Sequence, residues 1–172
     1  MAKKSENDKN IIEGLNSEKE SVIINTIKNL YSSGSVDVLP HLLKLFFLYP
    51  GELVRVEILG VINNLKDQKA SVFLVEAVKK YKGQKNYNEL ISACWQNGLD
   101  FSDDINIFVD LVIEADLPTA IEAFSVVEGN ISEISDQDRN NIAKYVKSKI
   151  NIAVDVKKDL IRELHSIVEF NH

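Results

Sequence analysis

An internal repeat of 34 to 35 residues is the feature of this chain that most limits what it can fold into. The segment 27–30 resembles the segment 62–65, and the apolar residues that follow keep the same register through a third copy. The matched residues are Val38, Leu39, Leu42 and Leu43, then Phe73, Leu74, Ala77 and Val78, then Ile107, Phe108, Leu111 and Val112. A looser fourth copy keeps Ile121, Phe124, Ile142 and Val146. This period in a two-helix unit is typical of an alpha solenoid, in which each unit needs its neighbours to complete a core.

Helix signals recur along the whole chain, and no segment shows a sustained alternation of apolar and polar residues. Ser17 and Glu20 are predicted to form a capping box, and Ser135 to cap a later helix. Gly83 and Gly98 are predicted to end helices. The predicted helices cover residues 11–15, 36–49, 52–65, 70–82, 87–97, 135–150 and 155–170, and others follow Ser17, Ser102 and Pro118. The sequence therefore predicts an all-α fold.

One repeat domain is predicted over residues 17–172, preceded by a polar segment and a short helix in residues 1–16. The single cysteine, Cys94, cannot form an internal disulfide, which suits a reducing, cytoplasmic compartment. No apolar run follows the first lysines, so no secretory signal is predicted. The longest apolar stretch, residues 45–49, is too short to cross a membrane.

Three short motifs in the second copy carry a resemblance to a known family. They are Val54-Arg55, Leu59-Gly60 and Leu65-Lys66-Asp67. Together they resemble the HEAT repeat of the armadillo-type alpha solenoids, especially its short bacterial form related to bilin-lyase subunits. The resemblance implies a right-handed alpha-alpha superhelix of about four helix pairs. Glycine is costly inside a helix, so Gly60 is expected to allow a neighbouring helix to approach closely.

The last predicted helix has the pattern of a terminal cap. Its apolar stripe is Val156, Leu160, Ile161, Leu164, Ile167 and Val168, and charged residues, including Lys157, cover the rest. A solenoid needs one apolar and one polar face at its end, because only one side of the last helix meets a neighbour.

Motifs that would indicate catalysis or cofactor binding are missing from the sequence. It contains no glycine-rich phosphate loop, no HExxH, no CxxC and no GxSxG. The histidines His41, His165 and His172 are far apart in sequence, whereas metal ligands normally cluster. Cys94 and Trp95 are interpreted as core residues, because no cationic side chain lies nearby to stabilise a thiolate. We therefore expect no catalytic, cofactor or metal site.

The charges are unevenly distributed. Residues 100–140 contain eleven acids and one base, a formal charge of −10, whereas residues 66–85 contain six lysines and two acids, a charge of +4. The whole chain carries −6. An acidic chain is a poor binder of nucleic acid, and a bipolar surface can steer a charged protein partner.

A candidate protein-binding surface follows from the resemblance, which implies that the second helix of each pair lines the inner face. In the repeat register His41, Glu76 and Asp110 share one position, and Leu45, Lys80 and Glu114 share the next. Phe47, Leu48 and Tyr49, with Leu45, exceed what the core needs. Either the N-terminal segment covers them through Ile11, Ile12 and Leu15, or they form an exposed patch that binds a partner.

The function predicted from the sequence is a non-enzymatic scaffold that binds a protein or peptide along the inner helix layer, as a monomer or weak homodimer. The alternative from another class is a HEAT-like alkylpurine DNA glycosylase, in which Trp95 and Asp110 would meet the flipped nucleotide. The acidic segment disfavours it, because such a cleft must attract phosphates. A third alternative, an accessory subunit of a bilin-lyase-like system, comes from the resemblance alone.

Overall fold

The fold is helical throughout the part of the chain that the structure describes. In the computed structural model this part is the backbone of residues 2–33, 36–49 and 51–170 and the side chains of residues 6–30, 36–49 and 51–169. It contains ten α-helices, three short 3-10 turns and no β-strand, which confirms the all-α prediction. The chain divides into two compact units, residues 1–93 and 94–172. The single domain and the superhelix predicted from the repeat stay predictions.

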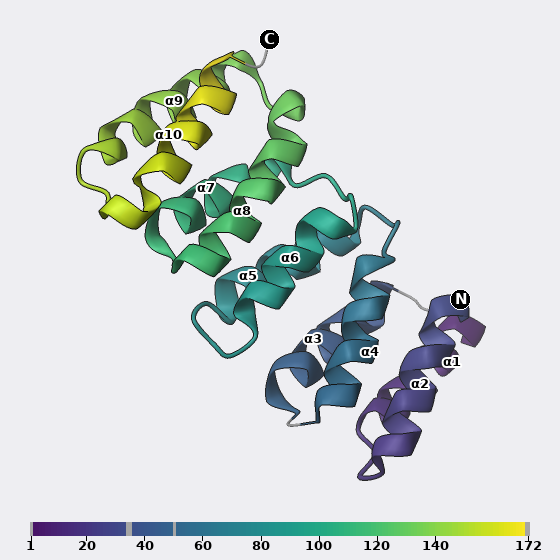
Figure 1. Cartoon of the computed structure of the whole chain (residues 1–172). Helices are drawn as coiled ribbons and strands as arrows, with labels where there is room; N and C mark the ends of the chain where they lie inside the picture. Colours follow the sequence, from purple (N-terminus) through teal and green to yellow (C-terminus); the bar gives the residue numbers. More distant parts are fainter. Residues whose placement is uncertain (1, 34–35, 50, 171–172) are drawn as a thin grey trace. The chain divides into compact units, whose positions relative to one another are not determined.

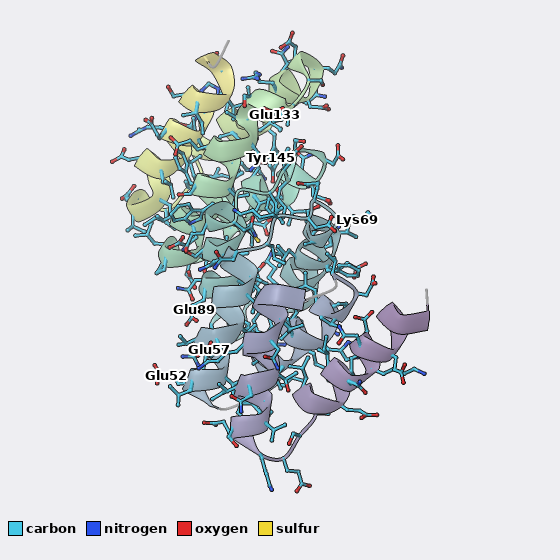
Figure 2. All side chains as sticks on the ribbon, turned by 90° about the vertical axis from the view of Figure 1, so that its right-hand side faces the viewer. Glu52, Glu57, Lys69, Glu89, Glu133 and Tyr145 are labelled. Carbon is cyan, nitrogen blue, oxygen red and sulfur yellow. The ribbon has the colours of Figure 1, made fainter. Side chains whose placement is uncertain are left out.

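Unit 1, residues 1–93, holds two rows of helices. Its helices are α1 (Ala2–Leu15), α2 (Glu20–Ser33), α3 (Leu39–Leu48), α4 (Glu52–Asn63), α5 (Ala70–Lys80) and most of α6 (Tyr87–Gln96) (Figure 1). α2 packs against α4, and α3 packs against both α4 and α5. Lys28 on α2 pairs with Glu57 on α4 at 3.4 Å, and Arg55 on α4 pairs with Glu89 on α6 at 3.3 Å. Figure 2 shows Glu57 and Glu89 on the same side of their helices.

Unit 2, residues 94–172, begins inside α6 and contains four further helices. α7 (Ile105–Glu114) packs against α8 (Leu117–Asn130), and α9 (Asp136–Ile150) packs against α10 (Asp155–Phe170) (Figure 1). α7 also contacts α9, and α10 contacts both α7 and α8. The last helix therefore packs on all three of the other helices of this unit that follow α6.

Contacts between side chains one repeat apart occur in both units. In unit 1 the Phe47 ring stacks on Tyr81, 34 residues later, with centroids 4.2 Å apart. In unit 2 the Tyr145 hydroxyl donates to Asp110, 35 residues earlier, over 2.8 Å. The repeat in the sequence thus corresponds to helices that lie next to each other within each unit.

Most of the apolar residues in the repeat register are buried, as predicted, but four apolar residues on the predicted helices are exposed. Leu53, Val56 and Val156 are 64%, 56% and 67% exposed, and Ile121 is 49% exposed. Helical periodicity indicates which residues share a face. It does not indicate how much of that face the neighbouring helices bury. On these helices the apolar stripe is wider than the surface that the neighbouring helices contact.

The predicted helix ends are confirmed in part. Gly83 and Gly98 adopt left-handed φ angles of 75° and 70°, where an L side chain would be strained. The Ser135 hydroxyl accepts the Asp138 N–H at 3.1 Å, as an N-cap should. Near the predicted capping box, Ser17 Oγ instead accepts from the N–H of Lys19, within a turn that precedes α2.

The N-terminal helix is longer than predicted and packs closely on α2. α1 begins at Ala2, and its residues Ile11 and Leu15 are buried. A Cβ atom at Gly14 would lie 2.3 Å from Thr26 Oγ1, so this glycine allows the close approach of α1 and α2. Gly60, for which such an approach was predicted, is half-buried and its carbonyl accepts from Asn64.

We expect Gly14→Ala to destabilise the protein by about 1 to 2 kcal/mol, because the overpacking cost exceeds the gain in helix propensity. Thr26 cannot rotate freely, since it is β-branched and its hydroxyl donates to Val22 O over 2.8 Å. The measurement is the free energy of unfolding in urea. In a Thr26→Ala background the same change should cost little, because the two nearest atoms are gone. A Gly14→Ala protein as stable as the parent would contradict the close contact.

Lys157 is buried, although its place on α10 predicted a solvated charge. The side chain is 6% exposed, and its ammonium donates to the carbonyls of Val112 and Ala115, at 3.3 and 2.7 Å, and to that of Ile113. These carbonyls lie at the end of α7, where no following turn can satisfy them and where a cation offsets the helix dipole. Burial lowers the pKa of Lys157, and the Asp116 and Glu114 carboxylates oppose that shift. Lys157 therefore attaches the terminal helix to α7.

Lys157→Met should lower the free energy of unfolding by about 2 to 3 kcal/mol, because charge-assisted bonds are lost and buried carbonyls are left without a donor. Methionine keeps the apolar stem, so packing changes little. The matched control is Lys158→Met, since Lys158 pairs only with exposed Asp155 in its own first turn, at 3.1 Å. We expect the control to stay within about 0.5 kcal/mol of the parent. Equal losses in urea unfolding would show that Lys157 is not an anchor.

Candidate functional site

The nine residues predicted to form a protein-binding surface lie on second helices of both units. Seven belong to unit 1: His41, Leu45, Phe47, Leu48 and Tyr49 on α3 and its C-cap, and Glu76 and Lys80 on α5. Two belong to unit 2: Asp110 and Glu114, both on α7. Three of the nine line a groove, Glu76 and Lys80 in unit 1 and Glu114 in unit 2.

The groove of unit 1 lies between α3 and α5. It has a volume of about 80 Å³, and Leu43, Phe73 and Tyr81 form its apolar walls. Glu76 and Lys80, both exposed, contribute one charge of each sign to its rim. The Lys80 ammonium lies 5.1 Å from the centroid of the Tyr81 ring, a cation–π distance that holds the lysine over the groove.

Phe47 is part of the packing between α3 and α5 and only half-exposed. Besides stacking on Tyr81 with an interplanar angle of 16°, it meets Phe46 edge to face with centroids 4.8 Å apart. Tyr81 itself is 5% exposed. The apolar residues at the end of α3 were predicted to be in excess of the core, but the ring of Phe47 has a partner in the next repeat.

Tyr49 and Leu48 differ in how they are covered. The Tyr49 hydroxyl donates to the Glu20 carboxylate over 3.3 Å, and partial burial together with that carboxylate raises the pKa of Tyr49. Leu48 is 61% exposed. One of the two alternatives was that the N-terminal segment covers the end of α3. α1 does pack on α2 and α3, yet Leu48 remains on the surface. The predicted patch is therefore smaller than its four residues, because Phe47 and Tyr49 are held by other contacts.

In unit 2 the register of the candidate surface continues into α9, which sequence analysis missed. Tyr145 is 35 residues after Asp110 and bonds to it, and Lys149 is 35 residues after Glu114. Lys149 lies 5.0 Å from the Tyr145 ring centroid, much as Lys80 lies over Tyr81. Extending the 35-residue period by one more copy would have identified both residues.

A larger groove lies beside these residues in unit 2. It has a volume of about 480 Å³ and runs between the end of α7 and the α9–α10 connection. Glu114 and Lys149 belong to its lining, together with Ile152 and Val154. Ile152 and Val154 are 75% and 62% exposed. Sequence analysis could have identified them, because the connection between the last two predicted helices is apolar and contains no Gly or Pro.

Of the two residues interpreted as core, Cys94 is buried as predicted and Trp95 is not. Cys94 is buried, and burial raises the pKa of its thiol, so the thiolate is disfavoured. Trp95 is not a core residue but 45% exposed, and its indole N–H donates to the Glu122 carboxylate over 2.7 Å. The Asp110 carboxylate is engaged by Tyr145. Trp95 and Asp110, the two residues of the glycosylase hypothesis, each have a partner in the protein.

Neither a metal site nor a membrane-spanning helix is found in the described residues. In the described part of the chain, no group of three or more His, Cys, Asp or Glu side chains is placed to hold a metal ion. None of the helices in these residues is both long and apolar enough to cross a membrane. No protein-family model, curated protein or solved structure matches the chain. The grooves and their charges are therefore the features of the described residues that bear on function.

The bond between Tyr145 and Asp110 should make stability depend on alkaline pH. Burial, and then the hydrogen bond to Asp110, raises the pKa of Tyr145 to about 12 from 10.0. Because the raised pKa belongs to the folded state, the bond stabilises fully below pH 10 and is lost as the pH rises towards 12. We expect the free energy of unfolding to fall more steeply across this window in the parent than in Tyr145→Phe. Asp110→Asn should also lower the pKa measured from tyrosinate absorbance, and parallel stability curves would contradict the bond.

Proposed function

We propose that this protein is a non-enzymatic interaction module of the HEAT-like type that binds a protein or peptide partner along its second helices. The observation that carries the proposal is that one repeat position of the second helices, which Lys80, Glu114 and Lys149 share, lines a groove in each unit. Glu76 and Lys80 line the groove of unit 1, and Glu114 and Lys149 line that of unit 2. Peptide-binding grooves of helical proteins commonly combine apolar walls with a few charged side chains at the rim.

The charges of the two units support a protein partner over a nucleic acid. Unit 2 contains seven Lys or Arg and fifteen Asp or Glu, a formal charge of −8, whereas unit 1 has thirteen and eleven, a charge of +2. Phosphate binding requires clustered cations, so the acidic unit disfavours the glycosylase alternative. The bilin-lyase-like alternative has no support beyond the resemblance. The proposed module acts in the cytoplasm as a monomer or weak homodimer.

Site-specific photo-crosslinking in the cell that makes the protein tests this function. A photo-reactive amino acid would replace Glu76 in one variant and Glu114 in another, because both side chains are exposed and line the grooves. Glu52 on α4, labelled in Figure 2, and Glu128 on α8 are matched controls, since both are exposed glutamates on first helices. We expect a discrete protein adduct from the groove sites and none from the controls.

Two results would contradict the proposal. One is the same adduct from control and groove sites, which would mean that the second helices are not the binding surface. The other is tight binding to duplex DNA near physiological ionic strength that weakens steeply with added salt, which would favour the glycosylase-like alternative.

A further inference from the structure

The α9–α10 connection in unit 2 exposes more apolar surface than a connection needs. Its four residues, 151–154, are Asn, Ile, Ala and Val, and Ile152 and Val154 are 75% and 62% exposed. Connections between helices normally carry polar residues, Gly or Pro, because they are solvated and must turn. Two neighbouring aliphatic side chains left in water at such a position indicate a surface that another molecule covers.

These two side chains form one wall of the 480 Å³ groove, and the end of α7 forms the other. The volume is within the range of about 300 to 1,000 Å³ that is typical of binding sites for small ligands and side chains. Ala153 and Ile161 add apolar atoms to the lining. The groove therefore has room for at least one large aliphatic side chain of a partner.

The polar part of the lining offers a ligand mainly hydrogen-bond acceptors, although its two carboxylates and two lysines balance in formal charge. Lys157 belongs to it, but the ammonium already donates to three carbonyls of α7, which uses all its N–H groups. Asp116 accepts the N–H of Thr119 at 2.9 Å, and this bond lowers the pKa of its carboxyl group, so the carboxylate stays ionised. Glu114 is exposed at the same edge. Lys149 is the remaining cation, and it lies over the Tyr145 ring.

We propose that this groove binds a basic amphipathic segment of a partner protein. An aliphatic side chain of that segment packs against Ile152 and Val154, and a Lys or Arg beside it pairs with Glu114 and Asp116. The formal charge of −8 on unit 2 attracts such a segment and repels an acidic one. This inference rests on the proposed function and names the chemistry of the partner at one of its two grooves.

The test uses the full chain and three synthetic peptides of equal length. The first places Leu at helical spacing with Lys between, the second has Glu in place of Lys, and the third has Ser in place of Leu. We expect only the first to bind with a Kd below about 1 mM, and to weaken as salt is added. Its binding should shift the backbone amide NMR signals of residues 113–116 and 151–154.

Variants of single surface positions then locate the site. Glu114→Lys, and separately the pair Ile152→Ser with Val154→Ser, should each weaken binding of the first peptide by about tenfold. Glu128→Lys and Val156→Ser are the matched controls. Both control residues are exposed in unit 2 and neither lines the groove, so their affinities should stay within about twofold of the parent. Exposed substitutions of this kind leave the fold intact.

Several results would overturn the inference. Equal binding of the Glu peptide, equal weakening by the controls, or no binding by the first peptide would each exclude a basic amphipathic ligand here. Concentration-dependent dimers that only the groove variants dissociate would assign the groove to a second copy of the chain. The proposed function would survive all of these provided that a partner still crosslinks from Glu76, and it would fail if a partner crosslinks equally from the first helices.

Discussion

The structure of each unit depends on contacts between side chains about one repeat apart. Helices of 10 to 16 residues bury a single face each, and that face is completed by the next pair. The stacking of Phe47 on Tyr81, the Arg55–Glu89 pair and the Tyr145–Asp110 bond all join residues separated by 34 or 35 positions. The period in the sequence thus indicates which side chains contact each other. Exposed positions on the second helices that make no such contact are those available to a partner.

The last helix of the described residues, α10, is held by a directional contact as well as by apolar packing. α10 buries Ile161, Leu164 and Val168 and leaves much of its charged surface in water. Apolar packing alone would not fix its position along α7, since such contacts are nearly non-directional. The hydrogen bonds from Lys157 to three carbonyls are directional, so they fix the position of α10 along α7. The same bonds give a donor to the carbonyls at the end of α7, where the chain turns into α8. A single lysine therefore stabilises one helix end and orients another helix, and it does so beside the groove assigned to a partner.

Sequence analysis could predict the features that depend on one helix at a time. The all-α fold, the apolar register, the left-handed glycines Gly83 and Gly98 and the Ser135 cap follow from local geometry. Features that depend on a neighbouring helix were missed or misjudged. The helical pattern placed Lys157 in solvent, yet the carbonyls that bind it come from residues more than 40 positions earlier. Ile121 and Val156 fit an apolar stripe, but no neighbouring helix covers that edge enough to bury them.

In the candidate surface, too, the sequence predicts which residues share a repeat position but not which neighbouring residues they contact. Glu76, Asp110 and Tyr145 share one repeat position, yet Glu76 lines a groove while Asp110 and Tyr145 bond to each other. Because side chains at this position point away from the apolar core, exchanging one of them changes the surface with little effect on packing. A repeat protein can therefore vary its ligand specificity position by position, while the buried residues of each copy keep the stack together. The groove beside Glu114 and Ile152 accordingly differs in volume from the groove beside Glu76 and Lys80, about 480 against 80 Å³, because each is lined by side chains of its own unit.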